Sequence, residues 1–191
     1  YDGSTHRWFL SELDIHTNSS TGAFLAPAQQ FIAVSQTSDP TGAWTLFSFD
    51  TTDDGTSGTP SNAGCPCFGD QPLIGADANG FYVSTNEFPL FTSGFNGTQL
   101  YAISKSGLET AAGSSGTTVS GTIPLVNHIN VGAMATPDTG GTWYSVQPAI
   151  VPPDGAAFAS DNGGTEYFLS ALQFFSNQPL DNRVAAWALT N

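Results

Sequence analysis

Two copies of one short motif begin with a polar pair that could bind a ligand. Residues 70–76 and 127–133 each run from an acid or amide through a polar neighbour to a β-branched residue and Gly-Ala. Carboxylate, amide and imidazole groups all form hydrogen bonds with the hydroxyl groups of a ligand. If both motifs are first strands of a repeated unit, one opening is lined by Asp70, Gln71, Asn127 and His128. In the structural alternative, the first residue of each motif caps a turn and the histidine bonds to a neighbouring sheet.

Carboxylates in the same region allow a catalytic interpretation. Glycoside hydrolysis uses two carboxylates about 5 to 10 Å apart across the scissile bond. Asp70, at the head of a strand, and Glu87, at the end of a later one, are the acid–base candidates. Sialidase activity also needs several arginines for the substrate carboxylate, and only Arg7 and Arg183 are present. No nucleophile elbow, H-E-x-x-H motif or P-loop occurs, so a glycosidase-like hydrolase is the one enzymatic alternative.

The two cysteines, Cys65 and Cys67, are separated by one proline. This is not the C-x-x-C redox pattern, and no second pair completes a zinc site. In an oxidising compartment we expect them to bond to each other and brace the loop before Asp70, the alternative being pairing outside the chain. The three histidines are scattered, so no metal site is expected. Residues 50–58 are acidic enough for calcium but lack EF-hand spacing, which favours a solvated loop.

Charge and composition exclude several classes of partner. Three Lys and Arg stand against 16 Asp and Glu, a formal net charge of −13, which repels nucleic acids and acidic membranes. No apolar run approaches the ~20 residues of a membrane span. A Lys-poor, Ser- and Thr-rich chain is typical of secreted proteins, and Asn18 and Asn96 stand in glycosylation sequons. Because the chain begins at Tyr1, we expect a processed form of an exported protein.

The elements that must position these residues are almost all β-strands. Short runs of aromatic and β-branched residues alternate with Gly, Asp, Asn, Pro and Ser clusters, and no sustained helical stripe occurs. We therefore predict an all-β protein, one domain over residues 1–191, with few and short helices. The predicted strands lie within residues 7–15, 30–37, 43–50, 80–88, 98–105, 142–150, 166–175 and 183–190.

These strands recur in a way that favours a β-propeller over a sandwich. Residues 2–11, 77–84 and 161–170 share an Asp, a Gly-containing turn, two aromatics, an aliphatic residue and a Ser, as expected of a second strand. A closing strand recurs at residues 31–37, 99–105 and 184–190. About three blades result, fewer than the four or more that close a ring. We expect a part of a larger propeller, or a ring completed by association with its remainder or another chain.

A further signature concerns two turns. Residues 136–143 fit the pattern Ser/Thr-x-Asp-x-Gly-x-Thr-Trp, and residues 37–44 match it with one insertion and Ala43 in place of Thr. These segments resemble the Asp-box of sialidase-like and glycosidase-like β-propellers. In that motif the Asp caps backbone amides, the Gly supplies a positive φ and the Trp anchors the hairpin. The resemblance implies structural roles for Asp39, Asp138, Trp44 and Trp143.

More broadly, residues 69–88 together with 181–190 resemble secreted bacterial propeller-type proteins of unassigned function. That resemblance implies a fold and not an activity. Our leading hypothesis is an extracellular module that binds carbohydrate or another surface ligand, and the third alternative is a structural role in a surface layer or filament. Aromatic side chains at loop tips would stack on sugars or, alternatively, pack between blades: Phe68, Phe88, Phe91 and Phe95.

Overall fold

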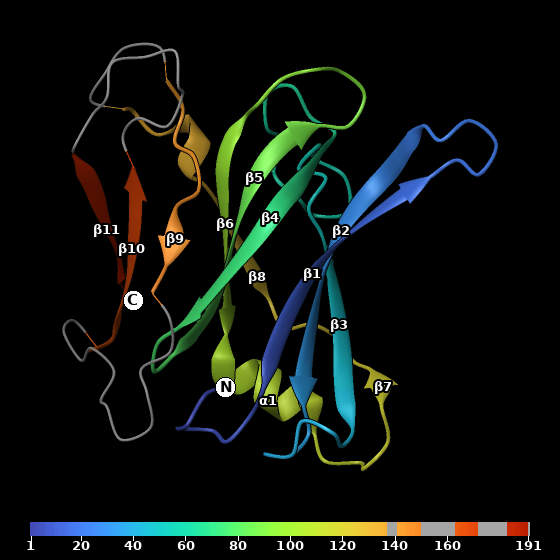
Figure 1. Ribbon diagram of the computed structural model, residues 1–191, viewed down its shortest axis with the longest axis vertical. Helices are drawn as coiled ribbons and strands as arrows, with labels where there is room; N and C mark the ends of the chain where they lie inside the picture. Colours follow the sequence, from blue (N-terminus) through green and yellow to red (C-terminus); the bar gives the residue numbers. More distant parts are fainter. Residues whose placement is uncertain (137–140, 150–162, 172–182, 191) are drawn as a thin grey trace.

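A computed structural model describes residues 1–136, 141–149, 163–171 and 183–190, and these form three open β-sheets with one short helix (Figure 1). The predicted all-β class is confirmed. Sheet 1 has the strand order β1-β2-β3-β7, in which β7 runs parallel to β3 and the other pairs are antiparallel. Its strands are β1 (Phe9–Thr17), β2 (Phe24–Ser35), β3 (Trp44–Asp50) and β7 (Val119–Ser120).

Sheets 2 and 3 are antiparallel throughout. Sheet 2 has the order β4-β5-β6-β8 and sheet 3 the order β9-β10-β11. The strands of sheet 2 are β4 (Cys67–Ala76), β5 (Gly80–Pro89), β6 (Gly97–Ser104) and β8 (Val126–Asn130). Those of sheet 3 are β9 (Gln147–Pro148), β10 (Thr165–Ala171) and β11 (Val184–Thr190).

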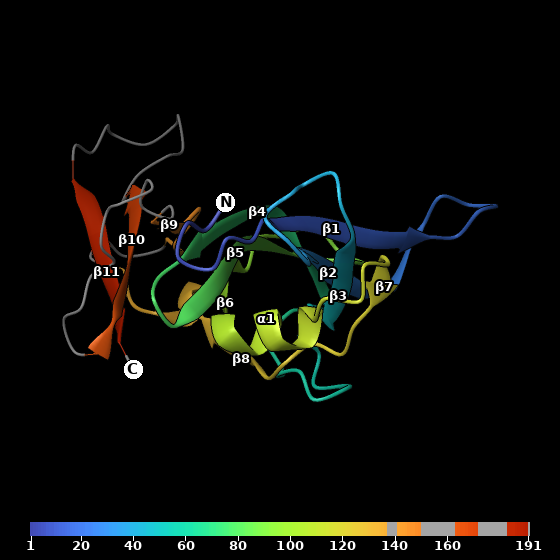
Figure 2. The ribbon, with the colours of Figure 1, turned by 90° about the horizontal axis from the view of Figure 1, so that it is seen from below.

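Sheet 2 lies between the other two sheets, as Figures 1 and 2 show together. On β5, alternate residues serve the two interfaces: Phe81 and Val83 pack in a core with sheet 1, and Tyr82 packs in a second core with sheet 3. Phe9 stacks on Phe81 at 5.0 Å, and Tyr82 meets Phe168 edge-on at 5.9 Å. Because both faces of β5 are covered, nearly all of its side chains are buried, polar ones included.

The helix α1 (Lys105–Ala112) follows β6 and packs against the core between sheets 1 and 2 (Figure 2). It begins where the Ser104 hydroxyl accepts a hydrogen bond from the Gly107 amide, a standard N-cap. Leu108 and Ala112, four residues apart, are its buried apolar face. The buried Lys105 forms a 2.8 Å ion pair with Asp2, which fastens the start of the chain to this helix. Within the described ranges, no helix has the length and hydrophobicity to cross a membrane.

Most predicted strands are confirmed, with two differences in the second half of the chain. Residues 127–133 are not a first strand: they form β8, at the outer edge of sheet 2, and the 3-10 turn η1 (Val131–Ala133). Of residues 142–150, as far as the structure describes them, only β9 joins a sheet. The last four residues of the predicted strand 166–175 lie outside the described residues. Residues 70–76 do belong to the first strand of a sheet, β4.

The three segments predicted as second strands take that place in sheets 2 and 3, whereas in sheet 1 the segment leads into the edge strand β1. As far as the structure describes them, the repeated segments run into β1, β5 and β10, and each of these strands pairs with the strand that follows it, β2, β6 or β11. Phe9 and Tyr82 face the next sheet along the chain, whereas the corresponding Phe168 faces the preceding one. The three described sheets are open and do not close a ring.

The turn at residues 37–44 contains local hydrogen bonds that involve two residues of the expected motif. Asp39 accepts hydrogen bonds from the Thr41 amide and hydroxyl at 2.9 and 2.7 Å, and the Trp44 indole donates to the Pro40 carbonyl at 3.1 Å. Gly42, however, is not among the residues with positive φ, so the expected role of that glycine is wrong. Trp143 is buried between sheets 2 and 3, and Asp138 lies outside the described residues.

Candidate functional site

The structure distributes the predicted site residues over three places. Asp70 and Gln71 lie near the start of β4, Asn127 lines a cleft at the other end of sheet 2, and Glu87 and His128 belong to a buried cluster between sheets 1 and 2. The expectation that the two polar pairs line one opening is therefore wrong. Its physical reason is topological, because β5 and β6 separate β4 from β8 in sheet 2.

Asp70 and Gln71 stand at an irregularity in β4. The pairing register with β5 shifts between Asp70 and Leu73, and Gln71 has a φ of 51°, so its side chain leaves the regular alternation of the strand. The exposed Gln71 accepts hydrogen bonds through Oε1 from Asn86 and from the Tyr144 hydroxyl, both at 3.2 Å. The half-buried Asp70 accepts one from the following amide at 2.8 Å. The bulge thus presents polar groups at the surface.

The segment 141–149 is held against this bulge. Asn86, opposite Asp70 in the register, accepts a hydrogen bond from the Ser145 amide at 2.9 Å and donates one to the Ser145 hydroxyl at 3.0 Å. These bonds place the Tyr144 ring beside Phe95, with ring centroids 5.4 Å apart. The roles of Asn86 and Tyr144 are not evident in the sequence, because they depend on a contact between residues 59 positions apart.

Five aromatic rings form a continuous row beside the bulge, which we call the aromatic row. Successive ring centroids lie 5.8, 5.7, 5.2 and 5.4 Å apart. None of the five side chains is fully buried, and the row crosses from the β1–β2 hairpin over the end of sheet 2 to segment 141–149. Its members are, in order, Phe24, Phe68, Phe88, Phe95 and Tyr144. Three of the predicted aromatics are therefore together; Phe91, 61% exposed, is not part of the row.

Asp70 and Glu87 do not form an acid–base pair. Asp70 is opposite Asn86 and Glu87 is opposite Gly69, so the two carboxylates lie on opposite faces of sheet 2. Glu87 is also 1% exposed. A sugar between the two carboxylates would have to pass through the sheet, so this geometry does not support the expected hydrolytic pair.

Glu87 belongs instead to a buried polar cluster on the side of sheet 1. Asp53, fully buried, bonds to Nδ1 of His128 at 3.0 Å and accepts a hydrogen bond from the Tyr101 hydroxyl at 3.4 Å. The amide of Asn62 donates to Glu87 at 3.2 Å. Burial, and then the charge of Asp53, raise the pKa of Glu87 to about 7. Burial likewise holds the pKa of the Tyr101 hydroxyl well above its usual value.

This buried cluster links the core to the acidic loop that the sequence suggested for calcium. Asp53 comes from that loop but bonds to protein groups, and Asp50 and Asp54 accept hydrogen bonds from Thr52 and Thr56 in local turns. These carboxylates therefore have structural partners. Sequence analysis missed Asp53 because its neighbours His128 and Tyr101 are far along the chain. The burial of the cluster keeps a large substrate away.

Cys65 and Cys67 are a close pair, with sulfur atoms 2.11 Å apart. Asn96 packs over them: its amide nitrogen lies 3.5 and 3.3 Å from the two sulfurs and donates to the Ala63 carbonyl at 2.8 Å. A glycan on that nitrogen would require this loop to open. Asn18, by contrast, is on an exposed hairpin turn, where its side-chain oxygen accepts hydrogen bonds from backbone amides.

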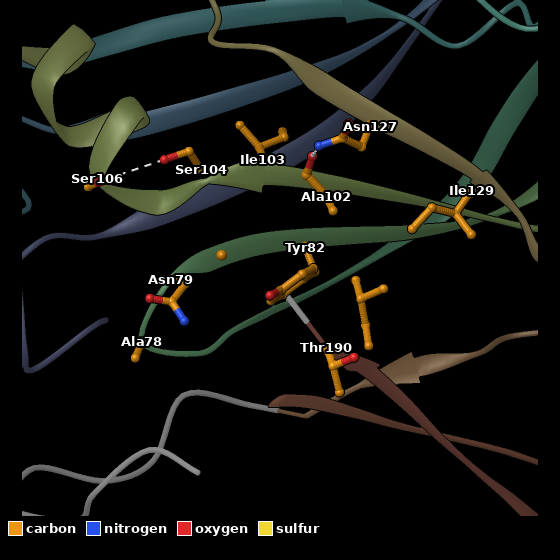
Figure 3. Close-up of a pocket in the computed structure, with 12 residues that line it drawn as sticks. Ala78, Asn79, Tyr82, Ala102, Ile103, Ser104, Ser106, Asn127, Ile129 and Thr190 are labelled. Carbon is orange, nitrogen blue, oxygen red and sulfur yellow. Dashed lines mark hydrogen bonds between the residues drawn. The ribbon is translucent and has the colours of Figure 1, made fainter. Parts of the chain in front are cut away.

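Asn127 lines a cleft of about 720 Å³ between sheets 2 and 3 (Figure 3). Tyr82 and Ala102 are its neighbours across the strands, and Leu189 and Thr190 of β11 contribute the other wall. This cleft adjoins the 77–80 turn, at the start of β5, while the aromatic row is at the end of that strand. The two features are thus separate sites.

Comparisons with known proteins add no further assignment. No protein-family model matches the chain, and no curated protein and no solved structure is similar to it at a significant level.

Proposed function

We propose that this protein is an extracellular carbohydrate-binding module that binds a glycan chain along the aromatic row. The observation that carries the proposal is the row itself, five neighbouring and partly exposed rings on one surface. Aromatic side chains combine a large apolar face with little conformational freedom, which suits them to stack on the C–H faces of sugar rings. A row of several rings suits an extended ligand better than a single sugar.

Polar groups beside the row supply the hydrogen bonds that such a ligand needs. Asp70 and Gln71 lie next to it, and Gln71 is bonded to the hydroxyl of Tyr144, a member of the row. A few well-placed polar groups beside an apolar surface are the usual source of orientation and specificity in ligand sites. With a net charge of −13, the protein should prefer uncharged glycans to acidic ones.

We further propose that the stacked sheets are part of a β-propeller that continues beyond this stretch or is completed by association. Two observations support this. The outer face of sheet 1 exposes Leu10, Phe31 and Leu46, and the outer face of sheet 3 exposes Tyr167 and Leu169. Exposed apolar sheet faces at both ends of a stack are expected where further sheets pack. If other chains pack on these faces, the protein should associate through them, and light scattering should give a molecular mass above that of one chain.

A glycan array tests the carbohydrate proposal. Wild type should bind at least one class of uncharged polysaccharide, and Phe88→Ala and Phe95→Ala should lose most of that binding. Phe91→Ala is the matched control, because it removes an equally aromatic and more exposed side chain outside the row. If no glycan binds, or if Phe95→Ala binds as wild type does, the row is not a glycan site and a structural role in a surface assembly is favoured.

A further inference from the structure

The cleft between sheets 2 and 3 exists because small residues lie between larger ones in the strand register. Across β5, β6 and β8, Tyr82 is opposite Ala102 and Ala102 is opposite Asn127. In the adjoining row, Gly80 is opposite Ser104. Alanine, glycine and serine leave a hollow between the tyrosine and asparagine side chains, and Figure 3 labels Tyr82, Ala102 and Asn127 around it. The register itself thus builds the cavity.

The opposite wall of the cleft belongs to a different sheet. Leu189 and Thr190 of β11 face the hollow, and Asn79 ties the two sides together by donating to the Gly163 carbonyl at 2.7 Å. The resulting volume of about 720 Å³ lies within the range of about 300 to 1,000 Å³ that is typical of small-molecule sites. Because two sheets contribute to it, a ligand would contact both.

The described lining is polar and uncharged. It combines hydroxyl and amide groups with apolar side chains, and no Asp, Glu, Lys, Arg or His is among the lining residues that the structure describes. The Asn127 amide donates to the Ala102 carbonyl at 3.4 Å, and the hydroxyls of Ser104 and Ser106 lie 3.3 Å apart. The polar groups of the cleft are Asn79, Tyr82, Ser104, Ser106, Asn127 and Thr190.

Two buried acidic side chains stand behind Tyr82. Asp77 and Glu166 are 3% and 2% exposed. Asp77 accepts hydrogen bonds from the Asn79 and Gly80 amides at 2.7 and 2.6 Å, so its charge is anchored in the turn beneath the cleft. Burial, then the charges of Asp77 and Glu166, raise the pKa of the Tyr82 hydroxyl, which stays protonated. The described lining offers an anion no cationic partner, and the Asp77 carboxylate beneath it disfavours one, whereas Glu166, whose pKa burial raises to about 8, is largely protonated at neutral pH.

We propose that this cleft is a second binding site, which accepts one uncharged sugar residue and rejects acidic sugars. Hydroxyl and amide groups match the hydroxyls of a sugar ring, while Ile129 and Leu189 offer apolar contact to its C–H face. The site is separate from the aromatic row and does not rest on the function proposed for it. A module with both sites would hold a glycan chain along the row and a single sugar residue at the opposite end of β5.

Backbone amide NMR tests the proposal with defined probes. Methyl β-D-glucopyranoside, methyl β-D-galactopyranoside and methyl α-D-mannopyranoside are added separately at millimolar concentrations, with sodium glucuronate as the acidic comparison. At least one neutral glycoside should shift the amide signals of Tyr82, Asn127 and Thr190, and glucuronate should not. The proposal is overturned if none of the three shifts them, or if glucuronate shifts them equally.

Two variants and two controls place the response in the cleft. Ala102→Leu fills the hollow and should abolish the shifts, and Asn127→Ala should weaken binding about tenfold, as expected for the loss of a ligand hydrogen bond. Ala111→Leu adds the same bulk on the exposed side of α1 and should bind as wild type does. Phe95→Ala should also leave these shifts intact, so failure of the aromatic row and failure of the cleft are distinguishable. Unchanged binding in both cleft variants would contradict the proposal.

Discussion

The hydroxyl of Tyr144 donates to Oε1 of Gln71 over 3.2 Å, and this hydrogen bond joins segment 141–149 to the bulge in β4. Through it the last ring of the aromatic row is fixed relative to the polar residues beside the row. The carbohydrate site thus depends on two segments that are 73 positions apart.

Removing that hydrogen bond should affect binding more than stability. Tyr144→Phe keeps the ring and loses the donor, so the free energy of unfolding should fall by about 1 kcal/mol, the usual contribution of one hydrogen bond. Affinity for the bound glycan should fall as well, because the ring is less firmly oriented. Urea unfolding and isothermal titration measure the two effects. Tyr167→Phe, on the exposed face of sheet 3, is the control and should change neither.

Stability should decrease as pH rises from mildly acidic to mildly basic. Glu87 and Glu166 have folded pKa values of about 7 and about 8, raised from 4.5 mainly by burial and then by Asp53 and Asp77 respectively. Between the ordinary pKa of 4.5 and these raised folded values, the folded protein holds more protons than the unfolded chain, so the free energy of unfolding falls with rising pH. We expect a loss on the order of a few kcal/mol from about pH 5 to about pH 9.

The variant Glu166→Gln tests whether Glu166 causes part of this loss of stability with rising pH. The amide is isosteric and uncharged, so the variant should flatten the part of the pH profile nearest pH 8. Denaturant midpoints at a series of pH values provide the measurement. Glu12→Gln, outside the core on β1, should keep the wild-type slope. A wild-type protein that is more stable at high pH than at low pH within this window would contradict the burial of ionisable carboxyls.

Removing only one partner of the buried ion pair between Lys105 and Asp2 should lower the free energy of unfolding strongly. Lys105 is 3% exposed and Asp2 is fully buried, at 2.8 Å from each other. Lys105→Met leaves a buried carboxylate without its cation, which typically costs about 3–5 kcal/mol. The double variant Lys105→Met with Asp2→Asn should recover much of that loss. Equal stability of the single and double variants, measured by thermal unfolding, would argue against the pair.

Gly75 is required for the contact between β4 and β9. A Cβ at this position would lie 2.3 Å from the Ala149 carbonyl oxygen and 2.5 Å from the Pro148 Cβ. Gly75→Ala should therefore push sheet 3 away from sheet 2 and destabilise the protein by about 1–3 kcal/mol. Gly141→Ala is the matched control, because nothing lies within 4 Å of its Cβ position. Similar melting temperatures for both variants would contradict the described packing.

Much of the fold follows from local sequence patterns, whereas the sites depend on long-range pairing. Runs of aromatic and β-branched residues between turn clusters predict β1, β5 and β6 well, because one or both of their faces enter a core. The likeness between residues 70–76 and 127–133 is misleading, since a local pattern does not specify which strand becomes the partner. Residues 127–130 pair with β6, the preceding strand of sheet 2, and so reach the outer edge of that sheet.

The same limit applies to the site residues. Phe68, Phe88 and Phe95 are recognisable as aromatics near strand ends, but their neighbours Phe24 and Tyr144 come from distant segments. Asp70 and Glu87 lie on opposite faces because of the register in which β4 pairs with β5. That register depends on where the bulge in β4 begins. Register and bulges are set by tertiary contacts, so the sequence predicts the residue types of the site and not their grouping.

Affinity as a function of glycan length tests the central claim most directly. A row of five rings can contact several sugar residues, whereas a single pocket contacts one. For the glycan class found on the array, isothermal titration should give about tenfold or greater tightening from the disaccharide to the hexasaccharide, equivalent to about 1.4 kcal/mol, and Phe95→Ala should remove most of that gain. Equal affinities for the two lengths, or a length dependence unchanged in Phe95→Ala, would contradict binding along the aromatic row.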